Sequence, residues 1–279
     1  MINTHHTPQL SRHLLPLYLL LVISLCGCQG VARVEAIETL DKLPSHEQAL
    51  EMSESRYSAE KPPAKILDVA LEVRRNYDLI LARREQLEIS VEVKGHFEKA
   101  VKQAGKKFES GDEDISLSAI TKLKLGLAGT LNDISRFNSD IALAQLRLEK
   151  YLGVRWAQEV DISGPKFQPA DFPYRTVNEF LKNNASGSKT LKESSLFDLR
   201  EAMIEINKAK GQLELGSKNR KMTRALLVTE AANYDFGIGN EADLFESLII
   251  YTRVLVGYYE AIHTFNISVY RFYSLNHTQ

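Results

Sequence analysis

The sequence predicts an all-α protein made of two long coiled-coil helical hairpins in tandem. Three observations support this prediction. Four long helix-forming runs follow one another, the second and the fourth carry a heptad repeat of apolar side chains, and the turns within the two pairs share an aromatic-x-x-Gly sequence. These turns are Phe108-Glu109-Ser110-Gly111 and Tyr234-Asp235-Phe236-Gly237. No run of alternating apolar and polar residues is long enough to predict a β-barrel strand.

The N-terminal 27 residues are typical of a secretory signal peptide. Arg12 and His13 precede an apolar run that ends at Leu25 and is too short to span a bilayer as a mature helix. The run closes with Leu25-Cys26-Gly27-Cys28, which resembles the lipobox of bacterial lipoproteins. That resemblance implies cleavage before Cys28 and attachment of lipid, including palmitate, at Cys28. The alternative, an ordinary signal peptide whose Cys28 forms a disulfide, lacks a partner, because cleavage removes the only other cysteine.

Residues 28–63 are predicted to be the lipidated N-terminus and a linker. They are mostly polar, contain Pro44 and end in Lys61-Pro62-Pro63, with one short helix expected around residues 36–43. Gln29 follows the lipidated position, which under the Gram-negative sorting rule indicates the periplasmic face of the outer membrane. Several acyl chains would anchor the protein to this membrane without spanning it.

The first hairpin is predicted over residues 64–153. A helix-forming run reaches Phe108, a polar turn covers residues 110–116, and a second helix continues to Leu152, where Gly153 ends it. The second helix carries a heptad seam with two polar members. The seam is Leu127, Leu131, Ile134, Asn138, Ile141, Gln145, Leu148 and Leu152.

An irregular connection over residues 154–195 leads to a second hairpin at 196–279. The connection contains three prolines and a short helix at 177–183. In the hairpin, the first helical run weakens across 211–224, a basic stretch that fits either a loop or a solvated helix turn. The last helix, from Ala242 to about Leu275, has a complete apolar seam that requires partner helices. The seam is Leu244, Leu248, Tyr251, Leu255, Tyr258, Ile262, Phe265, Val269 and Phe272.

The doubled aromatic-x-x-Gly hairpin resembles the TolC-type outer membrane efflux protein family. The matching segments are KKFESGDEDIS through QLRLEKYLG and YDFGIGNEADLFESL through RFYSL, within residues 66–153 and 196–275. The resemblance implies a homotrimer whose hairpins form a hollow helical cylinder in the periplasm. It also implies partners, namely a periplasmic adaptor and an inner-membrane pump that meet the hairpin turns. The β-strand pairs of the family have no counterpart here, so lipid at Cys28 is expected to replace the barrel as the anchor.

The glycines of the turns are explained by backbone geometry. Gly111 and Gly237 are placed where a helix ends in the left-handed conformation, and Gly239 permits a second sharp bend. Asn240 is positioned to cap the last helix, with Asp243 at the third helical position of a capping box. The hairpin turns are therefore assigned to Gly111, Gly237, Gly239 and Asn240.

A candidate pore entrance lies just after the second turn. Asp243 and Glu246 are three residues apart and share a helix face that Ser247 extends, away from the apolar seam. Two interpretations stand: a solvated helix start, or, as the resemblance implies, stacked carboxylate rings that line the entrance of a trimer and favour cations. Tyr234 either bonds across neighbouring hairpins to hold this entrance shut, as the resemblance implies, or is the last seam residue.

Other charged groups favour solvated surfaces. Asp112, Glu113 and Asp114 lack the remaining oxygen ligands of a calcium loop, so a solvated turn is preferred to a cation site. The basic stretch is more simply a solvated helix face than a surface for lipid phosphates. This group is Lys208, Lys210, Lys218, Arg220, Lys221 and Arg224.

Composition excludes several classes of function. The formal charge of -1, with no basic stripe interleaved with aromatics, argues against nucleic acid as a partner. No Ser/His/Asp set, phosphate-binding glycine loop or metal cluster is visible, so neither an enzyme nor a cofactor or metal site is expected. The sequence therefore predicts a lipid-anchored component of an efflux or export duct. The alternative is a non-conducting scaffold lipoprotein that binds partner helices.

Overall fold

The computed structural model describes residues 37–58, 63–112, 115–183 and 193–277. Contacts divide the chain into two units, Met1–Ile37 and Glu38–Gln279, and every described helix and strand belongs to the second. The predicted signal peptide and Cys28 lie outside the described residues. Within the described residues, no helix is both long enough and apolar enough to cross a membrane.

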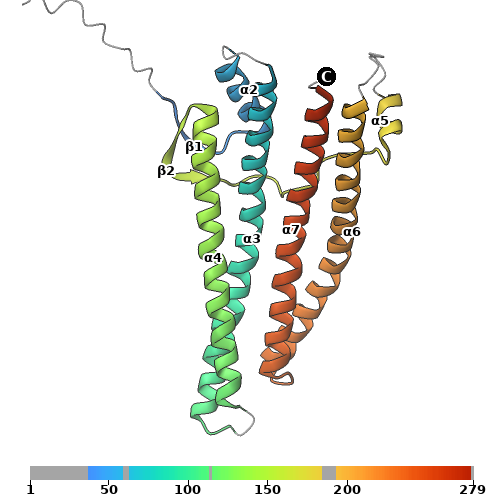
Figure 1. Ribbon diagram of the computed structural model, residues 1–279. Helices are drawn as coiled ribbons and strands as arrows, with labels where there is room; N and C mark the ends of the chain where they lie inside the picture. The colour runs from blue at the N-terminus through green and yellow to red at the C-terminus, as the bar shows by residue number, and fades with distance from the viewer. Residues whose placement is uncertain (1–36, 59–62, 113–114, 184–192, 278–279) are drawn as a thin grey trace, which may run out of the picture. The chain divides into compact units, whose positions relative to one another are not determined.

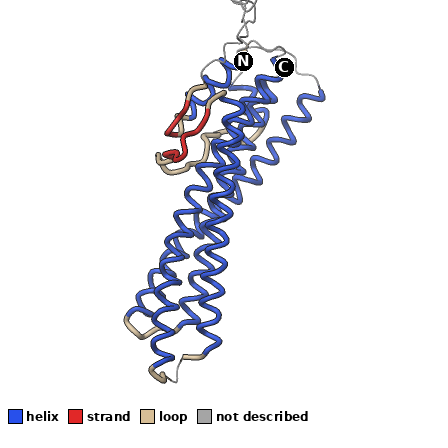
Figure 2. The backbone as a smooth tube through the Cα atoms, turned by 90° about the vertical axis from the view of Figure 1, so that its left-hand side faces the viewer, coloured by secondary structure: helices blue, strands red, loops and turns tan. Residues whose placement is uncertain are grey.

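Four long helices form two hairpins, which confirms the predicted all-α fold (Figure 1). The first hairpin pairs α3 (Pro63–Glu109) with α4 (Leu117–Leu152), and the second pairs α6 (Glu193–Asp235) with α7 (Glu241–His277). The hairpins meet mainly through α3 and α7, so the helices form a layer in the order α4, α3, α7, α6. Both hairpin turns lie at the same end of this layer (Figures 1 and 2). Helices α4 and α6 are its two edges.

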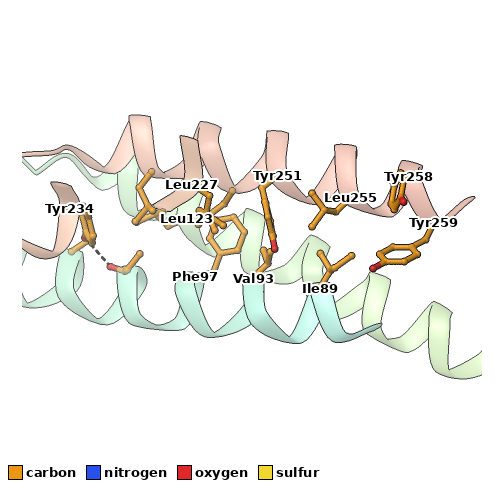
Figure 3. Close-up of a cluster of buried hydrophobic side chains, with 14 of the residues drawn as sticks. Ile89, Val93, Phe97, Leu123, Leu227, Tyr234, Tyr251, Leu255, Tyr258 and Tyr259 are labelled. Atoms are coloured by element: carbon orange, nitrogen blue, oxygen red, sulfur yellow. Dashed lines mark hydrogen bonds between the residues drawn. The ribbon is translucent and has the colours of Figure 1, made fainter. Parts of the chain in front are cut away.

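The predicted seam of α7 is buried along its whole length. From Leu244 to Phe272, no member is more than 8% exposed. The side chains pack against α3 on one side and α6 on the other, including Phe97 and Leu227 (Figure 3). Burial of a large apolar side chain contributes about 1.5 to 3 kcal/mol, so this seam is the main source of cohesion in the fold.

The seam of α4 differs from its prediction in the half nearer the turn. Ile141, Leu148 and Leu152 are buried as expected, but Leu131 is 46% exposed and Asn138 is exposed. The buried face there consists instead of Leu123, Gly126, Thr130 and Phe137. Gly126 sets this face, because a Cβ atom at that position would lie 2.5 Å from the ring of Phe97. The close approach of α3 rotates the predicted seam away from the core.

Helix α6 runs without interruption through the stretch that the sequence left open between a loop and a helix turn. Two of its basic residues contact tyrosines of α7. Arg220 lies 4.6 Å from the ring centre of Tyr258, and Arg224 donates to the hydroxyl of Tyr251 at 3.2 Å. That hydroxyl donates in turn to Glu92 of α3 at 2.8 Å. Part of the basic stretch therefore takes part in contacts that join α6 to α7 and α3.

Polar contacts from one short segment of α3 bind the hairpins together. Arg83 pairs with Asp140 of α4 at 2.7 Å and with Glu260 of α7 at 2.6 Å. Gln86 donates to the carbonyl of Val256 at 2.9 Å. Because these contacts join α3 to both α4 and α7, they fix the register of the hairpins relative to each other.

The neighbouring residues of α3 hold the connection between the hairpins. Arg84 donates to the carbonyls of Ile162 and Pro165, and Glu85 accepts from the amide of Phe167 at 3.1 Å. Arg84 and Glu85 also pair at 2.8 Å while almost fully buried. A connection that looks irregular in the sequence is thus held by a buried ion pair. The short helix α5 (Val177–Asn183) coincides with the one predicted.

The segment interpreted as a linker contains secondary structure instead. Residues 39–42 form a strand, β1 (Thr39–Lys42), where a short helix was predicted, and β1 pairs in parallel with β2 (Arg155–Asp161). Helix α2 (His46–Tyr57) follows and packs on α3 and α4. Both strands lie beside the helices at the end away from the turns (Figure 2). A strand of four residues is too short to show an alternating pattern in the sequence, and its pairing with β2 depends on a segment far along the chain.

Candidate functional site

The two hairpin turns are built by the same backbone motif. In the second turn, Gly237 has φ 74°, its amide donates to the carbonyl of Tyr234, and the amide of Ile238 donates to the carbonyl of Asn233. In the first, Gly111 has φ 81° and bonds to Phe108, while Asp112 bonds to Lys107. Both patterns are Schellman caps, in which a left-handed glycine satisfies the last helical carbonyls. The aromatic-x-x-Gly repeat in the sequence therefore corresponds to a repeated helix end.

Gly239 lies in a bend, as predicted, and is also required for space. Its φ is not positive, and a Cβ atom there would lie 3.0 Å from both the Cβ of Asn233 and the amide nitrogen of Tyr234. Asn240 caps α7, since its Oδ1 accepts from the amides of Ala242 and Asp243 at 2.9 Å each. Its Nδ2 also donates to the Asp243 carboxylate at 2.7 Å. The second bend and the cap both lie where the sequence placed them.

The two carboxylates proposed for a pore entrance are exposed on one face of α7. Within the described chain, neither Asp243 nor Glu246 forms an ion pair. Ser247 does not extend their face: it is 2% exposed, and its hydroxyl donates to the carbonyl of Leu244 at 2.8 Å. The predicted polar face is therefore limited to the two carboxylates, both of which are exposed to solvent.

Tyr234 joins the second hairpin to the first. It is 5% exposed, and its hydroxyl donates to the carbonyl of Ala100 on α3 at 3.4 Å (Figure 3). Burial and the nearby Glu241 carboxylate raise its pKa well above the ordinary value, so the hydroxyl keeps its proton. Tyr234 is thus a buried residue that also bonds the two hairpins of one chain. Its role in holding an entrance shut stays a prediction.

Two ion pairs at this end were missed from the sequence. Lys107 pairs with the nearly buried Glu241 at 3.5 Å, and Lys99 pairs with Asp235 at 2.6 Å. Both lysines belong to α3 and both acids to the second hairpin. The sequence shows the charges but gives no signal for which of them meet, since the pairing depends on the relative register of α3 and α7.

The tip of the second hairpin presents apolar side chains to solvent. Phe236 is 81% exposed and Ile238 is 78% exposed, one on each side of Gly237. The first tip is more polar: Phe108 is 46% exposed, and Glu113 and Asp114 lie outside the described residues. Among the described residues no group of three or more His, Cys, Asp or Glu side chains is placed to hold a metal ion. The second tip therefore offers an apolar contact surface, and the exposed Asp243 and Glu246 follow it in the first turns of α7.

Apolar stripes also remain uncovered on both edge helices. We call the α6 residues the α6 stripe. They lie on one face because Phe197 and Leu215, like Ile204 and Met222, are separated by five turns of 3.6 residues. The α6 stripe consists of Phe197, Ile204, Leu215, Met222 and Leu226, between 38% and 69% exposed. The α4 stripe consists of Leu117, Leu125, Leu131, Leu143 and Leu146, between 46% and 66% exposed.

Comparisons with known proteins give a match in fold but none in sequence. No family model and no curated protein matches the chain. Among solved structures, CusC, described in terms of folding and transmembrane channel formation, has a TM-score of 0.58 at 10% identity over 82% of this chain and 73% of its own. The outer-membrane channel OprN gives 0.58 at 11% identity over 82% and 69% of the two chains.

The Campylobacter jejuni outer membrane channel CmeC is similar to the same extent. It has a TM-score of 0.60 at 11% identity, over 82% of this chain and 66% of its own. At such low identity, only the fold carries over from these channels. The agreement extends over most of the described helices, in hairpins that the sequence had already suggested. The chain therefore has a TolC-type fold.

Proposed function

We propose that this chain is a subunit of a helical export duct, formed when several copies close into a ring. The observation that carries the proposal is the pair of apolar stripes on α4 and α6. Soluble monomers seldom leave large contiguous apolar patches in water, and such patches usually mark contacts with another molecule. Here they lie on the two edges of a four-helix layer, where further helices would continue it.

The position of the stripes favours a closed ring over a two-fold dimer. If α6 of one copy packs on α4 of the next, each contact joins two different surfaces, and such contacts close into rings. A homotrimer is the expected ring for this fold.

In such a ring, the turns from all copies would surround one end. The exposed carboxylates of Asp243 and Glu246 are our candidates for stacked rings at a cation-favouring entrance. Tyr234 would hold this end narrow by tying α6 to α3. Phe236 and Ile238 would meet a periplasmic adaptor that leads to an inner-membrane pump, because an exposed apolar tip fits the apolar groove of a partner helical hairpin. Lipid at Cys28 would anchor the assembly to the outer membrane.

Charge placed in the α6 stripe tests the assembly. We expect the full chain in a non-ionic detergent to give trimers by native mass spectrometry. The double substitution Ile204→Glu and Leu215→Glu is expected to give monomers, because it buries two carboxylates at each contact. Val228→Glu is the matched control, since Val228 is 62% exposed but lies on a different face of α6. A monomeric parent chain, or equal loss of trimer in the control, would refute the ring.

Neutralising the candidate entrance separates a duct from a scaffold. Asp243→Asn with Glu246→Gln removes both charges while keeping the size of each side chain. A duct predicts changed solute sensitivity of cells with the trimer intact, because the field at the entrance changes. Unchanged transport in cells that depend on this protein would favour the non-conducting scaffold.

A further inference from the structure

A cavity of about 550 Å³ lies at the end of the helices opposite the turns. Its walls come from α2, α3, the connection before α5, and the last turns of α7. The size falls within the range of small-molecule sites, roughly 300 to 1,000 Å³. The lining is mainly apolar and includes Leu67, Ala70, Leu71, Ala170, Val269 and Tyr273.

One cationic side chain, that of Arg74, belongs to this mainly apolar lining. The guanidinium carbon of Arg74 lies 4.9 Å from the ring centre of Tyr270, and both side chains line the cavity. In the part of the chain that the structure describes, Arg74 has no carboxylate within ion-pairing distance. A guanidinium in such surroundings presents donors that match a planar anion in two-point contact.

The carboxylates near Arg74 differ in their burial. Asp78 is 4% exposed and accepts a hydrogen bond from Asn266 at 2.9 Å. Burial raises the pKa of Asp78 to about 6, so its own negative charge is costly there. Glu54 and Asp171 also line the cavity but are exposed, whereas Arg74 is half-buried. Among the charged side chains of the lining, the cation of Arg74 is thus the more deeply placed and the two carboxylates are the more exposed.

We propose that this cavity binds a single-tailed anionic amphiphile, whose headgroup pairs with Arg74 and whose alkyl chain lies along the apolar wall. The opposite arrangement, a cationic headgroup, would place like charges together at the inner end. The exposed Glu54 and Asp171 disfavour headgroups of more than one negative charge. The ligand chemistry is therefore that of a fatty acid or of a lysolipid with a singly charged phosphodiester. The site shares no residue with the proposed duct and does not depend on it.

Native mass spectrometry of the full chain in dodecyl maltoside tests the site. The probes are laurate, lauroyl-lysophosphatidylglycerol and dodecyltrimethylammonium, which share a chain length and differ in headgroup. We expect at least one anionic probe to bind with 1:1 stoichiometry per chain and to raise Tm, since a ligand that binds only the folded state stabilises it. The tighter of the two anions identifies a free acid or a lipid headgroup as the source.

Three substitutions make the test specific to Arg74 and the cavity. Arg74→Met should weaken anion binding about tenfold or more, the usual effect of losing a charge-assisted hydrogen bond. Ala70→Phe should block binding by filling the cavity. Arg75→Met is the control, because Arg75 lies outside this cavity and pairs with Glu72 on the surface. Absence of anionic adducts on the parent chain, equal binding of the cationic probe, or equal weakening by Arg74→Met and Arg75→Met would overturn the proposal.

Discussion

The seams of α7 and α4 have the same four-three spacing in the sequence but differ in how completely the fold covers them. Every member of the α7 seam is buried by helices of the same chain. In the α4 seam, Leu131 is 46% exposed and Asn138 is also exposed. The difference teaches that a heptad repeat identifies a contact face but does not say whether its partner belongs to the same molecule. A seam covered within the chain stabilises the fold, whereas an uncovered seam is available for assembly.

Truncating one leucine in each seam should separate these two roles most strongly. Leu248→Ala removes a fully buried side chain from the α7 seam, and we expect a loss of about 3 kcal/mol in the free energy of unfolding. Leu131→Ala should change the unfolding free energy of the separated chain by less than about 0.5 kcal/mol and weaken only the oligomer. Urea unfolding in dilute detergent, followed by circular dichroism, measures both. Similar losses for the two variants would remove the distinction.

The stability of the packed interface between α3 and α7 should also depend on pH through Asp78. Folding raises the pKa of this carboxyl from 3.8 to about 6, mainly through burial. The folded state therefore binds the proton more tightly than the unfolded state does. The contribution of Asp78 to stability is highest below about pH 4 and falls as the pH rises through about 6, by about 3 kcal/mol in total.

His46 has the opposite dependence, so the measurement requires a variant. Burial and then Arg74 lower the pKa of His46 from 6.5 to about 4, and its contribution is lost as the pH falls through this range. Subtracting the unfolding curve of Asp78→Asn from that of the parent chain isolates Asp78. We expect the difference to change steadily between pH 4 and 6.5 and to be flat above. A flat difference across the whole range would mean that folding does not change the pKa of Asp78.

The sequence predicts features set by local spacing better than features that depend on how distant segments align with each other. The α7 seam, the two glycine-ended turns and the Asn240 cap follow from local spacing and local geometry. The capping box at Ser45 and Gln48 was also readable, yet the polar composition around it favoured a linker. Strand β1 carries only four residues of weak pattern. Its existence depends on backbone pairing with β2, which no local rule contains.

The candidate site was predictable only in part, for the same reason. Asp243 and Glu246 share a face because of their spacing alone, which is a property of any helix. The burial of Ser247 depends on how closely α7 approaches its neighbours. The pairing of Lys107 with Glu241 depends on the register of two helices far apart in the sequence. Periodicity gives the face of one helix and leaves its neighbour's register undetermined.

Two buried tyrosines of the second hairpin bond to α3, and removing the hydroxyl of each should lower the free energy of unfolding by different amounts. Tyr251 donates to the Glu92 carboxylate at 2.8 Å, whereas Tyr234 donates to a backbone carbonyl at 3.4 Å. We expect Tyr251→Phe to cost about 1.5 kcal/mol and Tyr234→Phe about 0.5 kcal/mol, because hydrogen bonds to charged groups contribute more. Urea unfolding of the two variants measures the difference. The reverse order would show that the contact of Tyr234 near the turn stabilises the interface between the hairpins more than the contact of Tyr251 does.

The smallest effect is expected where the interface reaches solvent, at the ion pair of Lys99 and Asp235. Their side chains are 52% and 43% exposed, so water and salt screen their attraction. We expect Lys99→Met to cost less than about 1 kcal/mol at low salt and nothing measurable in 1 M NaCl. Lys102→Met is the control, since Lys102 is exposed on the same helix and has no ion-pair partner in the described chain. A loss that persists in high salt, and is absent in the control, would mean that this contact acts by packing at the tip. The packed interface between the two hairpins would then extend to the end of α6.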